Sequence, residues 1–306
     1  MNTSNDALWN GAGRRIHMQE VGTRDGLQVE SVFVPTADKI ALVDTLSAAG
    51  LAKIEVTAFV SPRAVPVLRD AGEVLRGIAR RPGVVYGALV PNLRGAERAI
   101  DARADELNLV MSASESHNLS NLRMTREQSF QALSEVAKMA ADAGVPVNIS
   151  LSCSFGCPME GDVPEDTVLE WSRRFVDDIG ARGVTLCDTT GMAYPSQVAQ
   201  LTRAFSKRWV ERDDTATELT LHFHNTRDMG LANVLAAIDA GADRFDASLG
   251  GIGGCPYAPG ASGNVCSEEI VHALQLMGYD TGVNLERLFD SIRERAMARD
   301  HIPTST

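Results

Sequence analysis

Short runs of apolar and β-branched residues alternate along the chain with longer segments in which apolar residues recur at helical spacing. The short runs predict eight strands, at His17–Gly22, Lys53–Ala58, Val84–Val90, Glu106–Met111, Val147–Cys153, Gly183–Cys187, Leu219–His224 and Arg244–Ala247. Amphipathic segments between them predict helices such as Thr36–Ala49, Val67–Arg80, Gln128–Ala143, Asp166–Arg182, Ser196–Lys207 and Leu231–Ala240. Repeated strand–helix units favour a parallel sheet, and eight units favour a (β/α)₈ TIM barrel.

Glycines indicate where several of these helices end. Gly50, Gly144 and Gly241 each follow a helical segment and precede the next apolar run, as a glycine at a helix C-terminus does. Residues 1–12 are polar and irregular, which predicts a flexible tail. Residues 13–306 are expected to form a single barrel domain with extra C-terminal helices, one of them capped by Asn284 and running through Leu285–Ala298.

Composition excludes several classes of protein. A net charge of −11 disfavours nucleic acid and anionic membranes as partners, and no run of eighteen apolar residues is present. Five cysteines, an odd number, without a secretory leader argue against a disulfide framework: Cys153, Cys157, Cys187, Cys255 and Cys266. We therefore expect a soluble protein in the cytoplasm.

The segment Leu249–Asn264, LGGIGGCPYAPGASGN, is a predicted loop because it holds six glycines and two prolines. Such a loop can close over a substrate, and Cys255 in it is a candidate acid or nucleophile. The alternative is an ordinary surface loop with an inert cysteine. The polar residues that end other strands favour the first interpretation.

In a (β/α)₈ barrel the active site lies at the carboxyl ends of the strands. Side chains expected there are Arg24, Asp25, Glu55, Thr57, Asp188, His222 and His224. Because strand residues alternate between faces, His222 and His224 point the same way, into the barrel. With a carboxylate such as Asp25 they favour a site for Mg²⁺ or Mn²⁺ over a closed zinc site. Two packed or surface histidines explain the pair equally often, and His117 is the one other histidine expected near the barrel mouth.

Three stretches resemble the 3-hydroxy-3-methylglutaryl-CoA lyases, a family of metal-dependent barrels related to Claisen-type synthases. They are EVGTRDGLQVE at 20–30, HFHNTRDMGLAN at 222–233 and GGIGGCPYAPGASGN at 250–264. The cysteine loop is a signature of the lyases, whereas the Arg-Asp pair and the His-x-His pair are shared with the synthases. The resemblance extends from about residue 16 to residue 288.

The resemblance implies roles for individual residues. Asp25, His222, His224 and Asn264 would surround the divalent cation. Arg24 would stabilise an enolate oxygen, Cys255 would act as acid and base, and Glu55 and Asp188 would be catalytic or supporting groups. Thr57, Thr185 and Gly254 would join Arg24 in binding substrate. The alternatives are an ion pair at a strand end for Glu55 and a helix N-cap for Asp188.

The implied activity is retro-Claisen cleavage of 3-hydroxy-3-methylglutaryl-CoA to acetyl-CoA and acetoacetate, a step of leucine catabolism, in a homodimer or homotetramer. Two departures leave the acyl group open: Ala58 stands where the lyases have serine, and Asn225–Asp228 stands where they commonly have Asp-Thr-Tyr-Gly. A lyase for another 3-hydroxyacyl-CoA, such as citramalyl-CoA, is the runner-up. A synthase that joins acetyl-CoA to a 2-oxo acid and a non-catalytic metal- or CoA-binding barrel are the remaining hypotheses.

Overall fold

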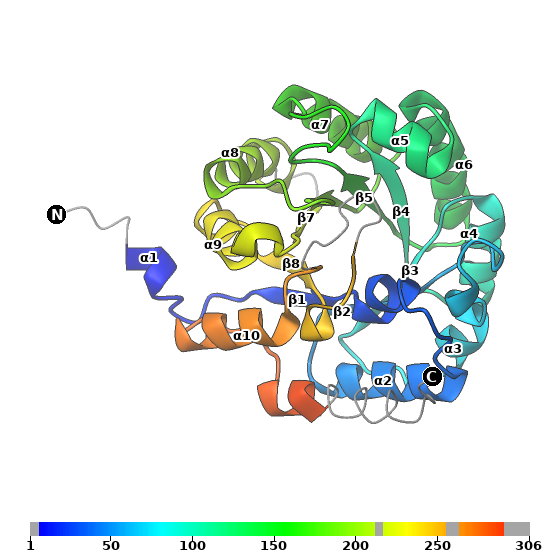
Figure 1. Ribbon diagram of the computed structural model, residues 1–306, viewed down its shortest axis with the longest axis horizontal. Helices are drawn as coiled ribbons and strands as arrows, with labels where there is room; N and C mark the ends of the chain where they lie inside the picture. Colours follow the sequence, from blue (N-terminus) through cyan, green and yellow to red (C-terminus); the bar gives the residue numbers. More distant parts are fainter. Residues whose placement is uncertain (1–5, 212–216, 255–262, 291–306) are drawn as a thin grey trace, which may run out of the picture.

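The computed structural model describes residues 6–211, 217–254 and 263–290. Eight parallel strands form one closed barrel in chain order, and helices surround it (Figure 1). The barrel closes where β1 pairs with β8, His17 lying opposite Arg244 and Glu20 opposite Ala247. The predicted (β/α)₈ fold is confirmed.

The strand bounds follow the apolar pattern closely. They are β1 (His17–Glu20), β2 (Lys53–Ala58), β3 (Val85–Leu89), β4 (Glu106–Ser112), β5 (Val147–Ser152), β6 (Gly183–Cys187), β7 (Glu218–His222) and β8 (Arg244–Ala247). The largest differences are at the ends of β1 and β7. The backbone leaves β1 for a π-helical turn, η1 (Gly22–Gly26), and His224 lies beyond β7 in an isolated bridge to Asn264.

The helices are α1 (Asp6–Trp9), α2 (Thr36–Ala48), α3 (Ala71–Gly77), α4 (Leu93–Asp101), α5 (Glu115–Leu122), α6 (Arg126–Asp142), α7 (Glu165–Arg173), α8 (Pro195–Phe205), α9 (Gly230–Asp239) and α10 (Ser267–Leu276). The predicted helix Val67–Arg80 is instead a 3₁₀ turn, η2 (Pro66–Leu68), followed by α3. The predicted Asp166–Arg182 and Ser196–Lys207 helices end in π turns, η3 (Arg174–Asp178) and η4 (Ser206–Val210).

Four of the helices, α1, α4, α5 and α10, fall outside the ranges that apolar spacing indicated, and α1 lies within residues 1–12, for which an irregular tail was predicted. In α4 the buried residues are small: Gly95, Ala96 and Ala99. Its start is set by the Asn92 side chain, which accepts a hydrogen bond from the Gly95 amide at 3.0 Å. In α5 the buried residues include the polar His117 and Asn118.

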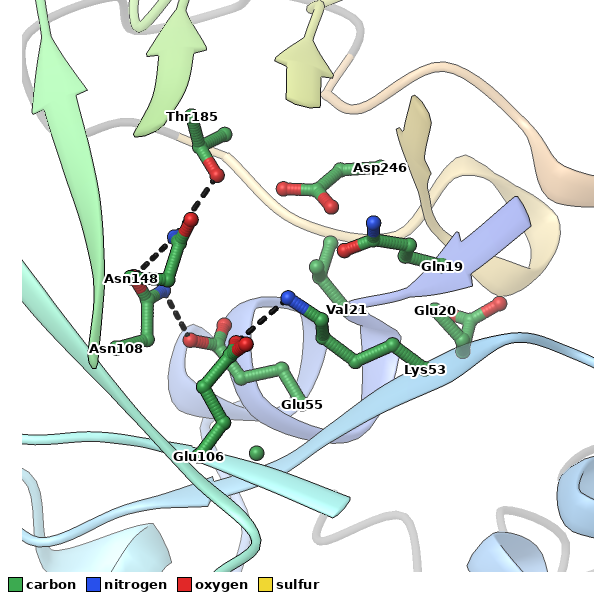
Figure 2. A pocket seen from close by; sticks show the side chains of 11 residues that line it. Gln19, Glu20, Val21, Lys53, Glu55, Glu106, Asn108, Asn148, Thr185 and Asp246 are labelled. Carbon is green, nitrogen blue, oxygen red and sulfur yellow. Dashed lines mark hydrogen bonds and ion pairs between the residues drawn. The ribbon is translucent and has the colours of Figure 1, made fainter. Parts of the chain in front are cut away.

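The apolar core lies between the outer face of the barrel and the helices, whereas the barrel interior is polar. On β6, for example, Val184 and Leu186 face the apolar core, and Thr185 alternates with them toward the interior. Figure 2 shows the residues that line a small pocket inside the barrel: Gln19, Glu20, Val21, Lys53, Glu55, Glu106, Asn108, Asn148, Thr185 and Asp246. The carboxylate of Glu20 points away from the others, to Leu249 and Ser267. These interior side chains lie directly beneath the residues at the carboxyl ends of the strands.

Residues 8–16 lie against the segment that follows α10. The Gly11 amide donates to the Met277 carbonyl at 2.7 Å, and the Tyr279 hydroxyl donates to the Leu8 carbonyl at 2.8 Å. After α10, residues 285–290 are helical, and the Asn284 side chain accepts from the Arg287 amide at 3.0 Å, as a helix N-cap does. The remainder of the predicted Leu285–Ala298 helix lies outside the described residues. Among the described helices, none has the length and apolar character needed to span a membrane.

Two glycines, each directly after a helix, allow the cost of a left-handed backbone conformation to be separated from the cost of a steric clash. Gly50 and Gly144 have φ values of +91° and +70°. A Cβ at Gly50 would lie 2.4 Å from the Gly282 carbonyl oxygen, whereas one at Gly144 would meet nothing within 4 Å. We expect Gly144→Ala to lower the free energy of unfolding by about 1 kcal/mol and Gly50→Ala by about 2–4 kcal/mol. Urea unfolding followed by circular dichroism measures both, and equal losses would contradict the expectation.

Candidate functional site

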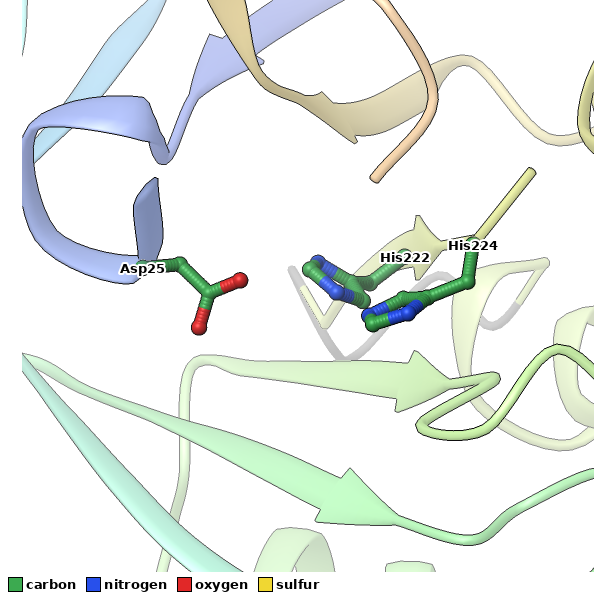
Figure 3. Close-up of side chains that lie close together, drawn as sticks. All are labelled: Asp25, His222 and His224. Atoms are coloured by element: carbon green, nitrogen blue, oxygen red, sulfur yellow. The ribbon is translucent and has the colours of Figure 1, made fainter. Parts of the chain in front are cut away.

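Asp25, His222 and His224 meet at the carboxyl ends of β1 and β7 (Figure 3). Their metal-ligating atoms lie within 4.8 Å of one another. The two imidazole rings have centroids 5.4 Å apart, as expected of residues on one face of a strand. Asp25 comes from η1, so the cluster joins the first and seventh strand–helix units.

Asn264 lies beside this cluster, where the predicted loop returns to the barrel. It forms an antiparallel bridge with His224, and its Nδ2 donates to Asp25 Oδ2 at 2.7 Å and to the Ile252 carbonyl at 3.0 Å. These two bonds use both hydrogens of Nδ2. Oδ1 is buried and has no hydrogen-bond partner among the described residues. An orphaned acceptor beside a carboxylate and two imidazoles fits a cation ligand.

The ionisation states of His224 and Asp25 also suit a cation. Burial and the neighbouring His222 lower the pKa of His224 to about 4, which leaves the His224 imidazole neutral at pH 7. Burial opposes ionisation of Asp25, but Arg24 and the histidines hold the pKa of this carboxyl below its usual value. His222 Nδ1 lies 3.3 Å from Asp246 Oδ2, and although burial lowers the pKa of His222, this carboxylate raises it overall. A carboxylate on the second ring nitrogen fixes the orientation of a metal-binding histidine.

Arg24 connects Asp25 to Glu55. Arg24 Nη1 donates to Asp25 Oδ1 at 2.6 Å, and Arg24 Nε donates to Glu55 Oε2. Glu55 is therefore an ion-pair partner, as the alternative interpretation expected, but it lies inside β2 and not at the strand end that was predicted. Arg24 connects it to the metal-ligand cluster. All three side chains are almost fully buried.

A cavity of about 720 Å³ lies over this cluster. Arg24, Asp25, His222, His224 and Gly254 all line it. The rest of its lining includes apolar side chains and a few polar ones, among them Val60, Leu89, Val110, His117, Ser150, Ser152 and Cys187. The structure thus brings five of the predicted site residues to one cavity, and Asn264 is bonded to one of them, Asp25.

Other predicted site residues lie elsewhere. Thr57 is buried in β2, and Thr185 accepts a hydrogen bond from Asn148 Nδ2 inside the barrel at 2.9 Å; neither is among the described residues that line the cavity. Asp188 Oδ1 accepts from the Met192 and Ala193 amides at 2.7 and 3.0 Å, so it caps the loop before α8 and not the helix itself. Burial raises the pKa of Asp188 to about 6. Cys255 lies outside the described residues.

The two departures from the lyase pattern do not reach the described lining of the cavity. Ala58 packs with Leu27 and Leu68 in a small apolar cluster. Asn225 Oδ1 accepts from the Gly230 amide at 3.1 Å, and Arg227 and Asp228 are exposed. The acyl group is therefore not decided by direct contact with these side chains in the described structure.

Sequence reasoning missed several polar groups near the site. Asp246, which orients His222, is at an inward position of β8, and strand alternation alone would have found it. Asn108, which donates to Glu55 at 2.6 Å, is at an inward position of β4. Cys187 lines the cavity, and burial raises the pKa of its thiol. No disulfide joins the four cysteines of the described part of the chain.

Glu20 holds the base of the predicted loop. Its carboxylate accepts from the Gly22 and Leu249 amides at 2.7 and 2.9 Å and from the Ser267 hydroxyl at 2.7 Å. It thereby connects β1 to the turn that follows β8 and to the start of α10. Burial raises the pKa of Glu20 to about 7, in spite of these hydrogen bonds.

This raised pKa predicts a pH dependence of stability. A carboxyl group with a raised pKa in the folded state stabilises the fold below its unfolded pKa and loses that contribution as pH rises through the folded value. We expect the free energy of unfolding of the wild type, relative to Glu20→Gln, to fall by on the order of 2–3 kcal/mol between pH 5 and pH 8. Urea unfolding at four pH values tests this. A difference that stays constant across the range would contradict it.

Comparisons with known proteins agree with this geometry. The HMGL-like family model matches residues 15–293. Hydroxymethylglutaryl-CoA lyase YngG of Bacillus subtilis is 43% identical over 280 residues, which cover 92% of both chains. The mitochondrial hydroxymethylglutaryl-CoA lyase of Homo sapiens is 41% identical over 278 residues, 91% of this chain and 84% of the relative.

Solved structures give the same result. An HMG-CoA lyase from Acinetobacter baumannii, in complex with coenzyme A and 3-methylmalate, has a TM-score of 0.87 and 43% identity, covering 100% of this chain and 95% of that one. The carboxyl transferase domain of Rhizobium etli pyruvate carboxylase, at 16% identity and a TM-score of 0.70, shares the fold alone. Because the match extends over nearly the whole chain and includes the ligand cluster, the chain belongs to the HMGL-like family.

Proposed function

We propose that this chain is a divalent-cation-dependent carbon–carbon lyase that cleaves 3-hydroxy-3-methylglutaryl-CoA to acetyl-CoA and acetoacetate. The observation that carries the proposal is the cluster of Asp25, His222 and His224 at the floor of a cavity that Arg24 also lines. Relatives that are 40–43% identical over about nine tenths of the chain are named hydroxymethylglutaryl-CoA lyases, which supports the same activity.

Asp25, His222, His224 and the Oδ1 atom of Asn264 would hold the cation. When bound, it supplies Lewis-acid chemistry that lowers the pKa of the substrate hydroxyl and fixes the substrate oxygens. Two nitrogen and two oxygen ligands favour Mg²⁺ or Mn²⁺ over a structural Zn²⁺. The neutral His224 ring and the ionised Asp25 are in the protonation states that metal ligands require.

The remaining chemistry falls to Arg24 and Cys255. The substrate hydroxyl first gives its proton to a base, for which Cys255 is the group that the lyase resemblance implies. The C2–C3 bond then breaks, the hydroxyl carbon becomes a ketone, and the bonding electrons remain on the leaving fragment as a thioester enolate. Arg24 is placed to stabilise that enolate, because Nε and Nη1 are held by Glu55 and Asp25 while Nη2 has no hydrogen bond in the described structure. Cys255, by its place in the lyase loop, would protonate the enolate carbon, and loop closure would exclude water.

A second candidate is a lyase for another branched 3-hydroxyacyl-CoA, such as citramalyl-CoA. The observation that favours it is the Acinetobacter baumannii relative, which binds coenzyme A together with 3-methylmalate, a branched hydroxy diacid. The predicted synthase activity has no such support. A role in leucine catabolism, a cytoplasmic location and a dimeric or tetrameric state stay predictions.

Acetyl-CoA release tests the proposed function. We expect purified protein with Mg²⁺ or Mn²⁺ to cleave 3-hydroxy-3-methylglutaryl-CoA, to lose this activity in EDTA and to regain it when the metal is restored. Citramalyl-CoA is the matched comparison substrate. Cleavage of citramalyl-CoA alone would leave the metal chemistry intact and move the assignment to the second candidate, and unchanged activity in EDTA would refute the cation site.

Asp246 provides a separate test of the cation site. Asp246→Asn keeps the shape of the side chain but removes the charge that fixes the His222 ring. Loss of such a support typically weakens metal affinity by about 10–100-fold. We expect that loss in Mn²⁺ titration by calorimetry, with little change in melting temperature of the metal-free protein. Unaltered Mn²⁺ affinity would show that Asp246 does not support a ligand.

A further inference from the structure

A continuous chain of polar side chains crosses the barrel interior beneath the cavity (Figure 2). It begins at Thr185 on β6, passes through Asn148 on β5 and Asn108 on β4, and ends at Glu55 on β2. Its successive donor–acceptor distances are 2.9, 2.9 and 2.6 Å. From Glu55 the chain continues through Arg24 to the ligand Asp25.

The amide of Asn108 can lie in one orientation only. Its Oδ1 accepts from Asn148 Nδ2 and from Ser150 Oγ, both at 2.9 Å. The reason is Glu55: its carboxylate, paired with Arg24, can only accept, so Asn108 must turn Nδ2 toward Glu55 Oε1. Asn108 Oδ1 then faces Asn148 and Ser150, and Asn148 donates to it from the same Nδ2 that donates to Thr185.

Glu55 uses its two carboxylate oxygens in two directions. Oε1 accepts from Asn108, and Oε2 accepts from Arg24 Nε. The residue is only 4% exposed, so water cannot replace a lost partner freely. Without Asn108, one oxygen of a buried carboxylate has no donor, and a buried unsatisfied charged group reorients or draws its other partner with it.

We propose that Asn108 is a positioning residue that acts through Glu55 to hold the Arg24 guanidinium against the enolate that forms in the cavity. The inference rests on the proposed function, because it takes Arg24 as the group that stabilises the enolate. Asn108 touches neither substrate nor cation: it does not line the described cavity, and it lies on the opposite side of Glu55 from Arg24. Substitution of Asn108 is therefore expected to lower kcat and to leave KM nearly unchanged.

Three variants separate positioning from packing. Asn108→Ala removes the donor, whereas Asn108→Asp keeps the shape and replaces the donor with a charge opposite Glu55. The control is Gln19→Met, which removes another buried amide of the barrel interior whose bond, 3.2 Å to Thr220 Oγ1, does not involve Glu55. The charged groups around position 108 are Glu55 and Lys53 from β2, Glu106 from β4, Arg24 from η1 and Asp246 from β8.

With the thioester that the wild type cleaves, we expect Asn108→Ala to lower kcat by about 10–100-fold and to leave KM within about 3-fold. Asn108→Asp is expected to lose as much at pH 8. Relative to wild type at the same pH, its kcat recovers several-fold toward pH 5.5, because the introduced carboxyl group, once protonated, again donates to Glu55. Gln19→Met keeps kcat within about 2-fold. Mn²⁺ affinity, measured by calorimetry, stays within about 3-fold in all variants because the ligands are unchanged.

The outcomes separate this inference from the proposed function. A wild type that cleaves neither 3-hydroxy-3-methylglutaryl-CoA nor citramalyl-CoA overturns both. With an active wild type, the inference alone is overturned by a kcat of Asn108→Ala within 2-fold of wild type, by a raised KM at constant kcat, or by an Asn108→Asp loss that is the same at every pH. A merely structural role would lower the melting temperature of Asn108→Asp without this pH-dependent recovery.

Discussion

The mouth of the barrel depends on one guanidinium group between two buried carboxylates. Arg24 pairs with Asp25 of its own turn and with Glu55 of the neighbouring strand, and all three side chains are nearly excluded from water. Removing Arg24 would leave two buried carboxylates without their counter-ion, which costs far more than a surface ion pair contributes. The same pairing keeps Asp25 ionised, and an ionised Asp25 holds the Asn264 amide. The ion pairs of Arg24 therefore balance the buried charges and also hold the proposed metal ligands Asp25 and Asn264 in position.

Buried charges are also paired deeper in the barrel, nearer the amino ends of the strands. Lys53 pairs with Glu106 at 2.6 Å, both largely buried, below the layer that contains Glu55 and Asn108. Barrels commonly fill this space with branched apolar side chains. Here amides and ion pairs occupy it, so the floor of the cavity is made rigid by directional bonds and not by shape alone.

The sequence determines much of this through simple periodicities. Alternation along β6 and β8 and the spacing of His222 and His224 place inward side chains well, because a strand has few ways to turn its residues. The ends of β1 and β7 were harder to predict, since η1 and the bridge at His224 depend on contacts with Leu249 and Asn264, which are distant along the chain. Thr185 shows the limit of alternation, which gives the face of a residue but not its depth in the barrel. At Thr57 alternation itself is interrupted, because the register of β2 against β3 shifts between Glu55 and Thr57. Asn108 carries no motif at all, and only its partners identify it.

The double hydrogen bond of Asn264 Nδ2 has a consequence for how this barrel can diversify. By bonding both the Ile252 carbonyl and Asp25, Asn264 ties the departing and returning ends of the glycine-rich segment to each other and to a ligand. The two ends are thus anchored independently of the residues between them, and the closure entropy of the segment is confined to a short connection. Sequence and length between those anchors are free to change which side chain meets the substrate while the ligand set stays where it is. The glycine-rich segment can therefore vary in evolution while the positions of the metal ligands are conserved.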